Sequence, residues 1–99
     1  MSETYTNGVW TVSPGEEEAF VQEWNALAAW GKTMPGAGTF RLVRNTDVPQ
    51  RFMSFADWES FEAQQAWKSS PEFKERMGRV KSHCTDFQPL VYELVSRVD

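Results

Sequence analysis

Hydrophobic and polar residues alternate along residues 50–56 (QRFMSFA), and this period of two predicts a β-strand with two distinct faces. Phe52, Ser54 and Ala56 share one of these faces. Similar segments, rich in β-branched and aromatic residues and bounded by turn residues, occur elsewhere in the chain. We therefore expect four strands, over residues 8–13, 39–44, 50–56 and 87–98.

Apolar residues recur three and four positions apart between these strands, which is typical of helices that bury one face. The first helix is expected to begin in the sequence Ser-Pro-Gly-Glu, with Ser13 as its N-cap and Pro14 in its first turn. Glu16 stands three residues after that cap. Gly31 is expected to end this helix.

A second helical region is expected to begin near Ser60 and to break at residues 68–71, where Ser70 and Pro71 predict a new cap and first turn. The order strand, helix, strand, strand, helix, strand predicts an α+β protein of the ferredoxin-like split βαβ plan, with an antiparallel sheet and helices on one face. Residues 1–99 are expected to form a single domain whose polar residues 1–7 are a disordered N-terminus.

The chain is rich in large rings, with five Trp, seven Phe and two Tyr among 99 residues. Each ring buries roughly 150–250 Å², so together the rings need more cover than one small sandwich can supply. The sheet face away from the helices would also carry Val43, Met53 and Phe55, an apolar patch. We therefore expect both a ring-lined pocket for a small aromatic molecule and a homodimer in which a second copy covers the open face.

Charge and motif content exclude several classes of function. The net charge is −4 with interspersed signs, so nucleic-acid binding is not expected. No apolar run approaches a membrane span, and the N-terminus lacks the regions of a signal peptide. The single Cys fits a reducing compartment, and we expect a cytoplasmic protein. No metal-ligand cluster or phosphate-binding loop is apparent, so no metal and no cofactor are expected.

The candidate site is the space between the sheet and the helices. The side chains of Ser54, on the third strand, and Trp58, at the junction that follows, are expected to point into this space. Apolar side chains on the helices, and an arginine that could hold an ionised oxygen, are expected to bind substrate there. Because a pocket wall and a packed core have the same spacing, these residues could also fill one another's gaps. The substrate-binding candidates are Phe20, Trp24, Phe52, Trp67, Phe73, Arg76 and Met77.

Three segments resemble the antibiotic biosynthesis monooxygenase family: S-P-G-E at residues 13–16, M-P-G-A-G-T-F-R-L at 34–42 and P-Q-R-F-M-S-F-A-D-W-E-S at 49–60. The resemblance extends from about residue 8 to residue 98. It implies a ferredoxin-like monomer that pairs into a dimeric α+β barrel. It also implies oxygenation of an aromatic, polyketide-like substrate without a cofactor.

The quinone-forming members of this family carry an Asn four residues before a Trp. In this chain Trp58 matches the Trp and Ser54 stands at the Asn position. A Tyr on their following helix corresponds to Gln64, and an Arg falls near Arg76 or Met77. The resemblance therefore implies that Trp58 positions the substrate ring and that Ser54 contacts a substrate oxygen, as the catalytic pair.

Two alternatives remain open. The replaced Asn and Tyr positions are also compatible with a non-catalytic small-molecule-binding or accessory domain of the same fold. In the haem-degrading branch of the family a Trp is followed ten residues later by an iron-binding His. Trp67 matches that Trp, but Met77 stands at the His position and the only histidine, His83, comes six residues later. A haem-binding or haem-degrading protein is therefore the less favoured alternative.

Overall fold

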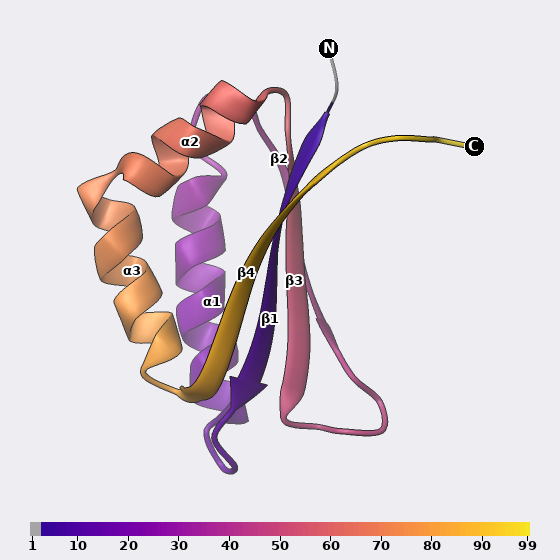
Figure 1. Ribbon diagram of the computed structural model, residues 1–99. Coiled ribbons are helices and arrows are strands. Elements are labelled where there is room, and N and C mark those ends of the chain that lie inside the picture. Colours follow the sequence, from indigo (N-terminus) through magenta and orange to yellow (C-terminus); the bar gives the residue numbers. More distant parts are fainter. Residues whose placement is uncertain (1–2) are drawn as a thin grey trace.

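The computed structural model describes residues 3–99, which form a four-stranded antiparallel sheet with all helices on one face (Figure 1). The order of strands in the sheet is β2-β3-β1-β4. With this connectivity the fold is the predicted ferredoxin-like split βαβ plan, and the second helical region consists of two helices, as the predicted break at residues 68–71 implies. The elements are β1 Thr4–Val12, α1 Glu17–Gly31, β2 Ala37–Arg44, β3 Arg51–Trp58, α2 Phe61–Ser69, α3 Pro71–Lys81 and β4 Cys84–Glu93.

Strand β1 lies in the centre of the sheet and pairs with both β3 and β4. Its buried and half-buried positions alternate along its whole length, as expected of a strand with one face on the core. Gly8 is the partner of Ser54 on one side and of Pro89 on the other. Proline has no backbone N–H, and Pro89 is tolerated because β4 is an edge strand that pairs with a neighbour on one side only.

The edge strand β2 has an irregular register between Ala37 and Phe40. There the carboxylate of Asp57 on β3 accepts a hydrogen bond of 2.9 Å from the backbone N–H of Thr39. Gly38 lies against that carboxylate, and a side chain at this position would collide with it. The side chain of Asp57 therefore replaces a regular pairing bond at the start of β2.

The helix-start predictions are confirmed in the second helical region and wrong in the first. The hydroxyls of Ser60 and Ser70 accept hydrogen bonds from backbone N–H groups in the first turns of α2 and α3. Ser13, in contrast, makes no side-chain cap bond, and its backbone N–H bonds to the carbonyl of His83 at the end of the sheet. Pro14 and Gly15 form a turn, in which Gly15 has φ of 89°, and α1 begins only at Glu17.

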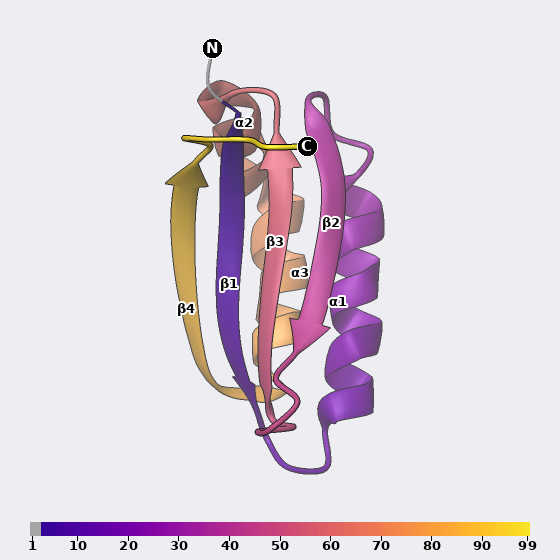
Figure 2. The same ribbon diagram turned by 90° about the vertical axis from the view of Figure 1, so that its right-hand side faces the viewer.

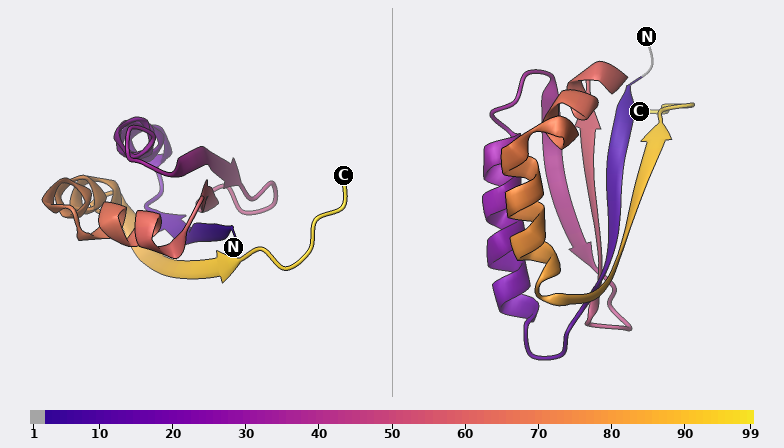
Figure 3. Two further views of the ribbon diagram at one scale, coloured as in Figure 1. Left: turned by 90° about the horizontal axis from the view of Figure 1, so that it is seen from above. Right: turned by 60° about the vertical axis from the view of Figure 1, so that its left-hand side comes forward.

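Both terminal strands differ from their predicted bounds. Strand β1 begins at Thr4, so part of the segment expected to be disordered pairs with β3 and β4, while residues 1–2 lie outside the described part of the chain. Strand β4 begins at Cys84, three residues before the predicted start at residue 87, and it ends at Glu93, before the predicted end at residue 98. Just beyond it, the backbone N–H of Leu94 still donates to the Glu3 carbonyl at 2.8 Å, and residues 95–99 extend away from the sheet (Figure 3).

The core lies between the sheet and the helices and is dominated by rings that contact one another edge-on or tilted. In the part of the chain that the structure describes, no helix covers the other face of the sheet (Figure 2). On that face Val43 and Met53 are each 44% exposed, and Tyr92 is 52% exposed. The apolar open face that the alternation predicted is therefore present.

Candidate functional site

A cavity of about 680 Å³ lies between the sheet and the helices. Strands β1 and β3 supply its floor, α1 and the α2–α3 pair supply its walls, and β4 borders it with Phe87 and Pro89. Its size falls in the roughly 300–1,000 Å³ range of small-molecule sites. Some of the rings, among them Trp24, Trp67 and Phe73, thus border an open space.

The floor of the cavity carries one hydrogen-bonded pair, Trp10 on β1 and Ser54 on β3. The indole N–H of Trp10 donates to the Ser54 hydroxyl oxygen at 2.9 Å. A hydroxyl has one proton to donate as well as lone pairs that accept, and no acceptor for the Ser54 proton is found among residues 3–99. Ser54 therefore presents a fixed oxygen with an available O–H donor.

Gly8 keeps this part of the floor open. A Cβ at this position would lie 2.8 Å from the Trp10 indole nitrogen and 2.9 Å from both the Ser54 hydroxyl and the Phe87 ring. Real Cβ atoms do not approach other atoms so closely, so only glycine lets these three side chains meet above the strand.

Five of the nine residues proposed from the sequence line the cavity: Ser54, Trp24, Trp67, Phe73 and Met77. They come from β3 and from all three helices, so residues far apart in the chain share one space. Trp67 and Phe73 meet edge to face with ring centroids 4.6 Å apart across the break between α2 and α3. That break places a continuous aromatic wall on one side of the cavity.

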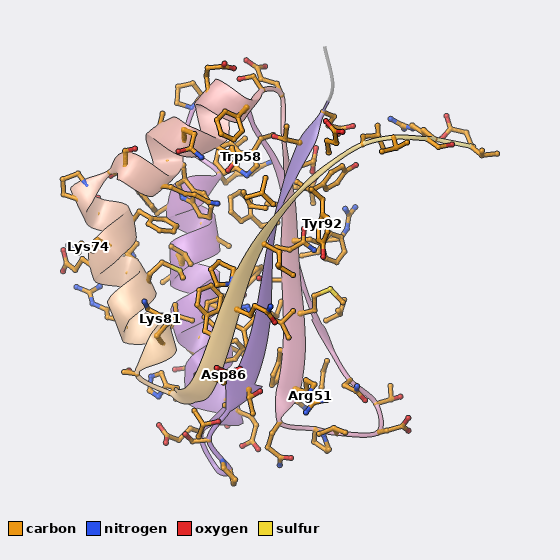
Figure 4. All side chains as sticks on the ribbon, viewed as in Figure 1. Arg51, Trp58, Lys74, Lys81, Asp86 and Tyr92 are labelled. Carbon is orange, nitrogen blue, oxygen red and sulfur yellow. The ribbon has the colours of Figure 1, made fainter. Side chains whose placement is uncertain are left out.

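The other four proposed residues, Trp58, Phe20, Phe52 and Arg76, do not line the cavity. Trp58 is only 1% exposed and lies behind the wall, where its ring packs on Trp67 at 5.0 Å and its N–H donates to the Thr6 hydroxyl at 3.1 Å. Figure 4 shows it at the end of the sheet that α2 covers. Through both contacts Trp58 adjoins residues that do line the cavity.

Phe20 and Phe52 pack on each other at 4.9 Å and belong to the closed part of the core. Arg76 bonds to Glu72 one turn earlier on α3, with 2.7 Å between the two groups, and lies over the Trp30 ring. Its guanidinium is therefore held away from the cavity by these partners.

The sequence analysis missed several lining residues, among them Trp10, Phe40 and Phe87 on the sheet and three lysines on the helices. A signal for two of the lysines exists in hindsight, because Lys74, Met77 and Lys81 are three and four residues apart and share one face of α3. In Figure 4 Lys81 lies at the end of α3 next to β4. Burial lowers the pKa of the third lysine, Lys68, on α2.

The titratable residues that first attract notice lie elsewhere. His83 contacts the Glu16 carboxylate at 2.9 Å and joins the end of α3 to the start of α1, outside the cavity. Burial, with a smaller effect of the Glu16 carboxylate, raises the pKa of the Cys84 thiol to about 11. Across the described residues no three His, Cys, Asp or Glu side chains gather as metal ligands. No helix between residues 3 and 99 is long and apolar enough to cross a bilayer.

The fold defines a ferredoxin-like α+β protein, and it has a cavity of small-molecule size between sheet and helices. The sequence model of the antibiotic biosynthesis monooxygenase family matches residues 5–79, well over half of the chain. The chain belongs to this family. No curated protein matches the sequence closely enough to count as a relative.

Solved structures share the fold at low sequence identity. SnoaB, a cofactor-independent oxygenase from Streptomyces nogalater, superposes with a TM-score of 0.86 at 19% identity, covering 100% of this chain and 97% of its own. A candidate antibiotic biosynthesis monooxygenase from Nitrosomonas europaea has a TM-score of 0.84 at 17% identity, covering 94% and 90%. A conserved protein from Methanosarcina mazei Go1 has a TM-score of 0.85 at 14% identity, covering 93% and 92%. These similarities establish the architecture.

Proposed function

We propose that this protein is a cofactor-independent monooxygenase that oxygenates a small aromatic, polyketide-like molecule in the cavity. The observation that carries the proposal is the ring-lined space of about 680 Å³ with the Ser54 hydroxyl on its floor. Membership of the antibiotic biosynthesis monooxygenase family supports it. So does the similarity to SnoaB, which is described as a cofactor-independent oxygenase.

The chemistry requires little from the protein beyond binding and charge stabilisation. Ground-state dioxygen accepts electrons one at a time, and the ionised form of an anthrone or hydroquinone can supply them directly. For a ring CH₂ group, one atom of O₂ becomes the new carbonyl oxygen and the other leaves as water with both hydrogens. The protein must favour the ionised ring and keep bulk water away from it.

Ser54 is the group that would stabilise the ionised substrate. Its oxygen is fixed by the Trp10 N–H, so the hydroxyl proton can be donated to a substrate oxygen above the floor. Trp24, Trp67, Phe73 and Met77 offer apolar surface to the faces and edges of a flat ring. Trp58 acts as a positioning residue, because it holds Trp67 and Thr6 in place without reaching the cavity.

We also propose that the protein is a homodimer formed by the open face of the sheet. Val43, Met53 and Tyr92 are exposed there, and Phe55 and Leu90 are half-buried beside them. Register pairs Met53 with Val9 and Val43, so these side chains share one face and form a contiguous apolar patch. In a two-fold dimer the same patch of a second copy would cover this one.

The test is oxygen uptake by the purified protein with an anthrone or dihydroquinone. The wild-type protein is compared with two variants in which an alanine of α1 is replaced by phenylalanine. Ala28 lines the cavity, whereas its neighbour Ala29 is exposed and does not. Ala28→Phe should fill the space and abolish substrate-dependent uptake, and Ala29→Phe should leave it unchanged. Ligand binding without any oxygen uptake by the wild-type protein would instead indicate a binding or accessory domain.

A further inference from the structure

The charges around the cavity differ sharply from those of the chain as a whole. The protein has fourteen acidic and ten basic residues and a net charge of −4. Three of its four lysines line the cavity, namely Lys68, Lys74 and Lys81, and we refer to them as the lysine rim. No Asp or Glu is among the residues that line the cavity in the described part of the chain. An acidic protein thus carries a purely cationic border around this one site.

Among the described residues, the three ammonium groups have no carboxylate partner. Within residues 3–99 the ion pairs of the helix layer are formed by Arg76, Arg79 and His83, and none involves the lysine rim. Lys68 is half-buried, and burial lowers its pKa, because part of its ammonium group has lost water without gaining an anion. An anionic group at the border would restore that interaction.

The position of the rim complements the apolar interior. Lys74 and Lys81 are exposed on one face of α3, with the buried Met77 between them, so their charged ends border the cavity where it meets solvent. The first turn of α3, which carries the positive end of the helix dipole, also lines the cavity. The floor, in contrast, offers a neutral hydroxyl and rings. A ligand suited to this arrangement has a flat apolar body and an anionic group at one end.

We propose that the substrate is an aromatic acid, whose ring system lies on the cavity floor and whose carboxylate is held by the lysine rim. This inference rests on the proposed function, because it takes the bound molecule to be the substrate. It adds the charge and the orientation of that molecule. The carboxylate fixes which end faces solvent, so the opposite end of the ring system is directed toward Ser54.

The experiment measures binding, separately from turnover, with a stable matched pair of probes. Anthraquinone-2-carboxylate and its methyl ester have the same ring system and differ in charge, and neither can be oxygenated at the quinone carbons. Trp10, Trp24 and Trp67 line the cavity, so quenching of tryptophan fluorescence reports occupancy. The acid should bind at least about tenfold more tightly than the ester at low salt, and this difference should shrink as salt screens the rim.

Charge variants distinguish binding by the lysine rim from a general effect of the protein's net charge. Lys74→Gln and Lys81→Gln should each weaken binding of the acid by about two- to fivefold and leave the ester unchanged. Arg79→Gln removes the same charge from an exposed position of the same helix that does not line the cavity, so it should change neither affinity.

Equal binding of acid and ester, no binding of either probe, or an equal effect of Arg79→Gln would overturn the proposal of an aromatic acid. These results are distinguishable from failure of the proposed oxygenation. In that case the acid would bind with the predicted lysine dependence, and no oxygen would be consumed with any oxidisable ring system.

Discussion

The indole N–H of Trp10 donates a hydrogen bond of 2.9 Å to the hydroxyl of Ser54, which links the two central strands at the floor of the cavity. The pair sets the direction of the one polar group that faces the ring-lined space from β3. Because Trp10 occupies a lone pair of the oxygen, the hydroxyl proton is left to be donated. This one hydrogen bond therefore both links the two strands and orients the donor that the proposed chemistry uses.

Removing either partner of this bond should separate its structural role from its chemical role. Ser54→Ala leaves the buried Trp10 N–H unpaired, which costs about 1–3 kcal/mol of unfolding free energy, and it removes the donor to substrate. We expect kcat/KM for oxygenation to fall about a hundredfold. Trp10→Phe breaks the same bond but keeps the hydroxyl, so its loss of activity should be clearly smaller. Equal losses in the two variants would contradict a direct role of Ser54.

The end of α1 depends on a residue without a side chain. A Cβ on Gly31 would lie 2.8 Å from the Phe40 ring and 3.0 Å from the Trp67 indole nitrogen. Gly31→Ala should therefore lower the unfolding free energy by about 1–3 kcal/mol, as overpacking does in a well-packed core. Chemical denaturation followed by far-UV circular dichroism measures the change.

Gly78 on α3 is the matched control for that substitution. Nothing lies within 4 Å of a Cβ added there, and the residue is exposed in the interior of a helix. Gly78→Ala should stabilise the protein by up to about 1 kcal/mol through helix propensity alone. If Gly31→Ala were equally stabilising, the close packing of Gly31, Phe40 and Trp67 would be wrong.

The single thiol should be unreactive at neutral pH. Burial and the Glu16 carboxylate raise the pKa of Cys84 to about 11, so the folded state favours the protonated thiol. Its contribution to stability is present below the ordinary thiol pKa and is lost as the pH rises through about 11. Alkylation by iodoacetamide should therefore be slow at pH 7–8 and accelerate only at high pH.

Cys84→Ala provides the reference for the stability measurement, because lysines and tyrosines also titrate in this range. The wild-type protein should lose more stability than the variant between roughly pH 9 and pH 11. Parallel pH profiles, or rapid alkylation at neutral pH, would show that the thiol is not shielded as the structure indicates.

The proposed dimer can be dissociated at its centre. Met53 is 44% exposed on the open face of the sheet, so Met53→Glu would place a charge in the middle of the interface. Light scattering should show twice the subunit mass of 11.4 kDa for the wild-type protein and the single mass for this variant. Val48→Glu changes an exposed residue in the β2–β3 turn and should remain dimeric. A monomeric wild-type protein would refute the pairing.

Local signals in the sequence were sufficient for the fold. Ser70 and Pro71 act within one helical turn, so the start of α3 could be predicted without tertiary structure. Ser13 has the same local signature, yet its backbone belongs to the end of the sheet through the distant His83 carbonyl. Cys84 fits a helical stripe as well as a strand, and only pairing with Val12 decides between them.

The site was harder to predict than the fold, because periodicity shows which face is buried and not what lies opposite it. Trp58 and Trp24 are both buried rings, but only Trp24 borders empty space. The lysine rim was missed because charged residues on a helix usually indicate a solvated face. Their common border with one cavity becomes visible only when α2, α3 and the sheet are assembled.

The fate of both oxygen atoms tests the central claim most directly. Metal-free protein is supplied with ¹⁸O₂ and an anthrone carboxylic acid, and the product is analysed by mass spectrometry. Cofactor-free monooxygenation predicts one ¹⁸O atom in the new quinone carbonyl, labelled water in equal amount, and dependence on the open cavity, so that Ala28→Phe is inactive and Ala29→Phe is active. Unlabelled quinone, hydrogen peroxide in place of water, or the same rate in buffer and in both variants would contradict the account.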